Sequence, residues 1–202
     1  MKKFKTEDLI NSLQEDVRRV TAAAEAMKSL DKIKLGYPLT NGKWTAIQAL
    51  EHLNIYSRYY LPAIEHAMNE ATQGRSAWFN SGTLGNYFTN SMKPTTVYEV
   101  KNKMKTMKSH HPPAALNADQ VIAEFVDNQN KLLQLLDQAR NYDLNAIRIP
   151  VTISKFIKFK LGDTFRFLVA HEQRHVVQAR NAIHALGIAT DKFPVILQAT
   201  AQ

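Results

Sequence analysis

Residues 161–187 constrain the fold most strongly, because they have the pattern of one long amphipathic helix of about seven turns. Asp163 or Thr164 stands near the expected start, and a glycine follows the expected end. His171 and His175 are four residues apart, so both lie on one face of this helix. The other residues of that face are apolar or small: Leu168, Ala179, Ala182 and Leu186. A helix with such a face packs into a core.

Two imidazoles inside a core-facing stripe need polar partners or a metal ion. Burying an unpaired polar group costs about 1–3 kcal/mol. The chain has no cysteine, so disulfides and thiolate sites are excluded, and a metal would be held by His, Asp or Glu. The partners of the two histidines are therefore expected from other helices.

Three further stretches have helical periodicity, at residues 6–30, 45–70 and 118–140. Thr45 and Gln48 form a T-x-x-Q pattern that predicts a capping box, and Asn117 is the expected cap of the third stretch. With no run of strands, the pattern predicts an all-α protein, a four-helix bundle, formed by residues 1–202 as a single domain.

Residues 71–116 are predicted to be an insertion between the second and third long helices. We expect residues 73–94 to be irregular, and a T-x-x-E pattern at Thr96 predicts a short basic helix that ends near Ser109. A loop of this length is often functional, for instance as a wall over a site. Residues 146–160 alternate apolar and polar side chains around Pro150, which predicts an extended connection or a small hairpin.

The formal net charge of +8 raises the question of anionic partners. The lysines are dispersed, however, and no basic patch is interleaved with aromatic residues, so a solvated basic surface is expected and nucleic-acid binding is not. The N-terminus has no apolar run like that of a signal peptide, and no stretch is long enough to span a membrane. These patterns indicate a cytoplasmic protein without a membrane partner.

The string H-E-Q-R-H at residues 171–175 matches the H-E-x-x-H helix of zinc peptidases. That kind of site needs a third ligand downstream, but Asn181 occupies one such position and no Glu follows Glu172. His52, on the inner stripe of the second helix, is the better third ligand. Spacing alone leaves two interpretations open, a three-histidine metal site or hydrogen-bonded core histidines.

Two segments resemble the DinB-like (YfiT-like) superfamily. The first, W-T-A-I-Q-A-L-E-H-L at residues 44–53, is similar to its W-[ST]-x-x-E-x-L-x-H-L motif, and F-L-V-A-H-E-Q-R-H-V-V-Q-A at residues 167–179 is similar to its last-helix signature. The resemblance implies a four-helix bundle that holds a divalent metal ion through His52, His171 and His175. The chain departs from the pattern at Gln48, where many relatives have Glu, and in the insertion at 71–116.

The resemblance also implies a function: a metal-dependent enzyme, either a thiol-dependent S-transferase or a hydrolase, acting on a small-molecule substrate. Zinc or nickel is the expected ion, with iron or manganese as options, and a low-molecular-weight thiol is an expected cosubstrate. A homodimer is one option for assembly. The alternative is a metal-free helical bundle that acts as a binding or stress-response module without catalysis.

Several residues are expected around the metal. Glu172, Gln178 and Glu51 are candidates for orienting the imidazoles by accepting their free N–H groups, although solvent-exposed positions are an equal alternative. The aromatic candidates for the pocket mouth, with core packing as their alternative, are Trp44, Tyr56 and Tyr59. Of the remaining histidines, His66 lies too far along its helix, His184 is assigned to packing, and His110 and His111 are exposed unless the insertion folds over the site.

Overall fold

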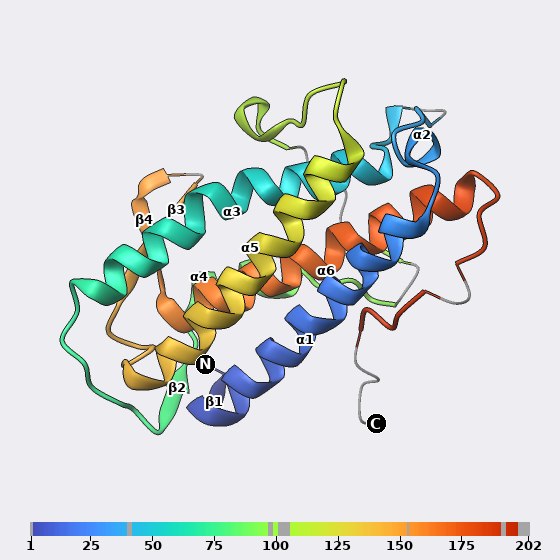
Figure 1. Cartoon of the computed structure of the whole chain (residues 1–202). Helices are drawn as coiled ribbons and strands as arrows, with labels where there is room; N and C mark the ends of the chain where they lie inside the picture. The colour runs from blue at the N-terminus through green and yellow to red at the C-terminus, as the bar shows by residue number, and fades with distance from the viewer. Residues whose placement is uncertain are drawn as a thin grey trace.

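The computed structural model describes residues 2–39, 42–96, 99–100, 106–152, 154–190 and 193–197. The described chain is mostly helical, which confirms the expected fold class (Figure 1). The helices are α1 (Thr6–Ala26), α2 (Lys32–Leu35), α3 (Ala46–Asn69), α4 (Thr83–Met92), α5 (Ala118–Gln138) and α6 (Leu161–Ala185). Short 3-10 turns lie at η1 (Met27–Ser29), η3 (Lys108–His110) and η4 (Ala139–Asn141). The strands are β1 (Lys3–Lys5), β2 (Trp78–Asn80), β3 (Arg148–Val151) and β4 (Ser154–Lys160).

The four long helices pack around a common interior, in the order α1, α5, α3, α6 and back to α1. Two clusters of buried apolar side chains fill that interior. One includes residues of the two small sheets, such as Phe79 and Phe159, and the other includes Leu35 of α2. Buried polar residues of α3, α5 and α6 stand between the two clusters along these helices: His52, Gln129, His171, Glu172 and His175. The core is therefore interrupted by a polar layer.

The start of α3 follows from its sequence. Thr45 Oγ1 accepts the N–H of Gln48 at 3.1 Å, and Gln48 Oε1 accepts the N–H of Thr45 at 3.1 Å, which confirms the predicted capping box. The helix continues past the exposed Pro62 to Asn69. Asn117 caps α5 as predicted, since its Oδ1 accepts the N–H of Gln120. These caps set the register of the residues that face the interior.

Strands β3 and β4 form the small hairpin that the alternation predicted. Strands β3 and β4 are antiparallel, with Ile149 opposite Phe159 and an irregularity between Pro150 and Val151. Proline cannot donate to a ladder, which accounts for the break at this point. The hairpin leads directly into α6.

The prediction that residues 73–94 are irregular is wrong. Strand β2 pairs with β1, and α4 packs against α6. Glycines permit close approach between these elements and α6. A Cβ on Gly85 of α4 would stand 2.4 Å from Asp163 Cγ, and one on Gly162 of α6 would stand 2.7 Å from the Phe79 ring of β2. Asp163 accepts hydrogen bonds from Ser81 Oγ at 2.5 Å and from the N–H of Gly82 at 2.7 Å. This carboxylate tethers the first part of the insertion to the start of α6.

The predicted basic helix near Thr96 is not present in the described part of its range. Thr96 Oγ1 accepts the N–H of Glu99 at 3.0 Å, as in the expected cap, but residues 99–100 and 106–107 are not helical. Residues 97–98 and 101–105 of the predicted helix lie outside the described residues. A capping contact alone does not stabilise a short helix, because nucleation in water is unfavourable without a packed face.

The two described parts of the insertion lie on opposite sides of the molecule. Figure 1 shows α4 behind α6, whereas the segment that precedes α5 passes over α3, and η3 contacts α3. Among the described residues, no helix is long and apolar enough to cross a membrane.

Candidate metal centre

Three histidines from two helices meet in the polar layer. His52 comes from α3, and His171 and His175 come from successive turns of α6. All three are buried, with 2%, 3% and 6% of their surface exposed. One ring nitrogen from each lies within 4.8 Å of the other two. The structure thus brings together the three residues that the sequence singled out.

The spacing of these nitrogens suits a shared ion. His52 Nε2 and His171 Nε2 are 3.2 Å apart, and the ring centroids of the three pairs are 4.5–5.1 Å apart. Two nitrogens bound tetrahedrally to one zinc ion, each at about 2.0–2.1 Å, stand about 3.3 Å apart. The imidazoles therefore need little movement to hold one ion.

The ring of His52 is oriented by the backbone of the insertion. Its Nδ1 lies 2.8 Å from the carbonyl oxygen of His110. Because a carbonyl only accepts, Nδ1 carries the proton in this contact and the Nε2 lone pair faces the other two histidines. This is the tautomer that a metal ligand needs.

The three imidazoles are neutral at physiological pH. Burial lowers the pKa of His52 to about 4, although the bond to the His110 carbonyl opposes this shift. Burial and the neighbouring histidines hold the pKa of His171 well below its usual value, and burial does the same for His175. Neutral imidazoles keep the lone pairs that a cation requires.

The other nitrogens of two of these histidines are unpaired. The Nδ1 atoms of His171 and His175 are buried and have no hydrogen-bond partner among the described residues. An ion bound at the Nε2 atoms would leave them unpaired too, and an unpaired buried polar atom costs about 1–3 kcal/mol. The close approach of the three rings, and not these Nδ1 atoms, supports the metal-site interpretation.

Aromatic rings surround the three histidines. The ring centroid of Trp44 lies 4.8 Å from that of His52 and 5.7 Å from that of His175. The ring centroid of Tyr56 lies 4.4 Å from that of His171. Phe167 was not a candidate from the sequence. It stacks on His171 with 5.7 Å between the ring centroids. Its position four residues before His171 is the signal that could have identified it. Tyr59 packs on Tyr60 instead, and its hydroxyl donates to the carbonyl of Pro150.

Residues 110–112 lie against the aromatic residues around the three histidines. This is one of the two alternatives that the sequence left open for His110 and His111. The His110 ring lies 4.8 Å from Tyr56, and the His111 ring packs edge-on against Trp44 at 5.8 Å. Pro112, next in the chain, is buried. Residues 110–112 thus form part of the wall of the site.

Glu172 points away from the histidines, toward α5. Its Oε1 accepts a hydrogen bond from Gln129 Nε2 at 3.1 Å. Burial raises the pKa of Glu172 to about 8, and the bond from Gln129 opposes this only weakly, so the carboxyl group is mostly protonated at neutral pH. Gln129 was missed at the sequence level, although a lone glutamine in the apolar stripe of α5 is a usable signal.

The other candidates for orienting the imidazoles differ in position. Gln178 is half-buried and raises the pKa of His175 through a hydrogen bond, against the larger effect of burial. Glu51 is engaged elsewhere, because it accepts hydrogen bonds from Arg58 at 2.9 Å and from Asn54 at 3.4 Å. His66 and His184 are exposed, so the assignment of His184 to packing is wrong.

The comparison with known families agrees with this geometry. The sequence model of the DinB superfamily matches residues 12–179, which include all three histidines. The chain belongs to the DinB superfamily. No curated protein and no solved structure matches it. The superfamily typically binds metal, and this member carries a buried histidine group that could do so.

Proposed function

We propose that this DinB-superfamily chain is a metal-dependent enzyme whose divalent ion is held by His52, His171 and His175. The observation that carries the proposal is the convergence of three buried, neutral imidazoles within 4.8 Å. Imidazole ligands suit zinc, nickel, iron or manganese, and zinc or nickel is proposed first. A divalent ion with only neutral ligands keeps its full charge, and it would acidify a bound water or thiol.

The residues around the centre would then hold and shield it. The His110 carbonyl sets the tautomer of His52, and the rings of Trp44, Tyr56 and Phe167 keep bulk water from the imidazoles. Three protein ligands leave at least one position for substrate, as in catalytic rather than structural sites. Gln178 is proposed to orient His175.

Two kinds of reaction are proposed, thiol-dependent S-transfer and hydrolysis. The carboxyl group of Glu172 faces Gln129 on α5, which argues against its use as the general base of a peptidase-like reaction. The aromatic lining supports S-transfer with a low-molecular-weight thiol, because sulfur packs favourably against ring edges. The substrate would be a small molecule.

We further propose that the four long helices form a single DinB-type bundle with residues 71–116 as its insertion. The cyclic packing of α1, α5, α3 and α6 supports this arrangement. A homodimer is proposed as its assembly, and neither nucleic acid nor a membrane is proposed as a partner.

Elemental analysis of protein purified without added metal, followed by titration with zinc and nickel salts, tests the metal centre. We expect about one ion per chain. A protein that holds no ion and takes up none on titration would be the metal-free binding module instead. Activity assays with and without small thiols would then separate S-transfer from hydrolysis.

A further inference from the structure

A cavity lies on the side of α6 opposite to the three histidines. It has a volume of about 290 Å³ and is walled by β1, α1, α4 and α6. Its α6 residues are spaced by three and four and lie on the reverse face from His171 and His175: Arg166, Val169, Ala170 and Gln173. The volume is at the lower end of the range for small-molecule pockets.

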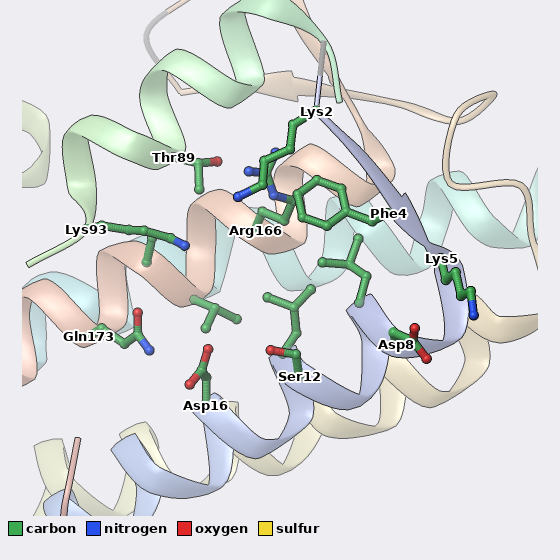
Figure 2. A pocket seen from close by; sticks show the side chains of 14 residues that line it. Lys2, Phe4, Lys5, Asp8, Ser12, Asp16, Thr89, Lys93, Arg166 and Gln173 are labelled. Carbon is green, nitrogen blue, oxygen red and sulfur yellow. The ribbon is translucent and has the colours of Figure 1, made fainter. Parts of the chain in front are cut away.

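Positive charge gathers at the α4 end of this cavity. Figure 2 shows Lys2, from the segment before β1, and Lys93, at the end of α4, reaching into the same space beside Arg166. Neither lysine forms an ion pair among the described residues. Burial, Arg166 and Lys2, in that order, lower the pKa of Lys93, and Asp16 opposes this weakly. The ammonium groups are close enough to repel.

Arg166 is a third cation beside these lysines, but its guanidinium already has hydrogen-bond partners. It is 5% exposed and donates to Asp163 Oδ1 at 3.0 Å and to Asn86 Oδ1 at 3.0 Å. Its guanidinium also packs over Phe4 at 4.7 Å. Arg166 and Asp163 thus form a nearly neutral pair that fixes this wall, and the other cations of the lining, Lys2, Lys5 and Lys93, outnumber its carboxylates, Asp8 and Asp16.

A buried hydroxyl lies beside these charges. Thr89 is 1% exposed, lines the cavity, and its Oγ1 has no hydrogen-bond partner among the described residues. A threonine within a helix ordinarily donates to a carbonyl of the preceding turn. A hydroxyl without that bond is a donor available to a ligand, and leaving it unpaired would cost free energy.

We propose that this cavity binds a small anion that carries a carboxylate or phosphate group. The charged group lies between Lys2 and Lys93 and accepts a hydrogen bond from Thr89 Oγ1. The rest of the ligand packs along the apolar wall of Phe4, Leu13 and Val169. Asp8 and Asp16 stand on the α1 wall, which keeps the negative charge of the ligand at the α4 end (Figure 2).

Inorganic phosphate and benzoate are suitable probes, each titrated by calorimetry and by thermal unfolding at constant ionic strength set with sodium chloride. The wild-type chain is expected to show saturable binding of at least one probe, with a rise in its unfolding temperature. Stronger binding of phosphate would assign a phosphorylated ligand, and stronger binding of benzoate would assign a carboxylic acid. If neither phosphate nor benzoate binds, the proposal is wrong.

Two variants locate the binding. Lys93→Gln is expected to raise the apparent Kd about tenfold, because it removes a charged contact. Thr89→Val keeps the shape of the side chain and is expected to raise the Kd about fivefold without lowering the unfolding temperature of the ligand-free protein. Unchanged binding in both variants would overturn the proposal.

Matched controls separate this site from general charge effects and from the metal centre. Lys158→Gln removes the same charge from the exposed face of the β3–β4 hairpin and is expected to leave the Kd unchanged. His52→Ala is likewise expected to retain anion binding. If binding is lost in His52→Ala but persists in Lys93→Gln, the anion binds at the metal centre and the cavity proposal is wrong.

Discussion

The two faces of α6 differ in what surrounds their polar groups. On one face, His171 and His175 are enclosed by aromatic rings and by another imidazole, so they are neutral and offer lone pairs to a cation. On the other face, Arg166 lies near Lys2 and Lys93, so the excess charge there is positive and favours an anion. Burial alone therefore does not define a site. The charge of the neighbours decides which ligand the buried groups favour.

Removing a histidine breaks the cation-binding face and has the largest expected effect. His52→Ala takes away one of three ligands, so metal affinity should fall by about a thousandfold or more. The stabilisation that the metal gives by mass action should be lost with it. Metal content and the unfolding temperature with added zinc measure both changes. His66→Ala, an exposed histidine on the same helix, is the control and should bind metal like the wild type.

Glu172 lies on a third side of α6, where burial raises its pKa and no nearby positive charge opposes the shift. Burial raises its pKa to about 8 from an ordinary value of 4.5, so the unfolded chain gains stability by ionising as pH rises between these values. Glu172→Gln removes this penalty. We expect it to stabilise the metal-free protein on the order of 4 kcal/mol at pH 8 and to have little effect near pH 4.5. Urea unfolding at the two pH values measures the difference, and an equal effect at both would contradict the assignment.

Lowering the pH should destabilise the protein through His52, whereas raising the pH should destabilise it through Glu172. Burial lowers the pKa of His52 to about 4 in the folded chain from an ordinary value of 6.5, so the unfolded chain binds the proton first as pH falls. Stability of the metal-free protein should therefore decrease between about pH 6.5 and pH 4, by about 3 kcal/mol from this group. In His52→Gln this acid-dependent loss should be smaller, whereas in His184→Gln it should be unchanged. Urea unfolding across this range provides the test.

The smallest expected effect concerns the docking of α4 on the anion-binding side. Gly85→Ala places a methyl group 2.4 Å from Asp163 Cγ, so the helix or the carboxylate must shift. We expect a loss of about 2 kcal/mol in unfolding free energy, typical of overpacking. Gly74→Ala, where no atom lies within 4 Å of the added methyl, is the matched control. A loss in Gly85→Ala no larger than that in Gly74→Ala would contradict the close packing of Gly85 on Asp163.

Local sequence determined much of this protein. The capping box at Thr45, the cap at Asn117, the hairpin before α6 and the placement of His171 and His175 on one face all follow from interactions within a few residues. Such interactions depend on residue type and spacing, which a sequence displays directly. The inner stripe of the second helix made His52 a candidate third ligand, and the resemblance to the DinB superfamily favoured it, because no local rule links residues so far apart in the chain.

Only the tertiary structure decided what meets across helices. Glu172 and Gln129 are both polar residues of helical stripes, and their pairing in the core became visible only when α5 and α6 were packed. Residues 73–94 were expected to be irregular, but Gly82 and Gly85 in this range allow close contact with Asp163 of α6. The placement of residues 71–116 has the same cause. Long-range contacts, whose partners the local pattern does not encode, place α4 against α6 and residues 110–112 beside His52 and Trp44.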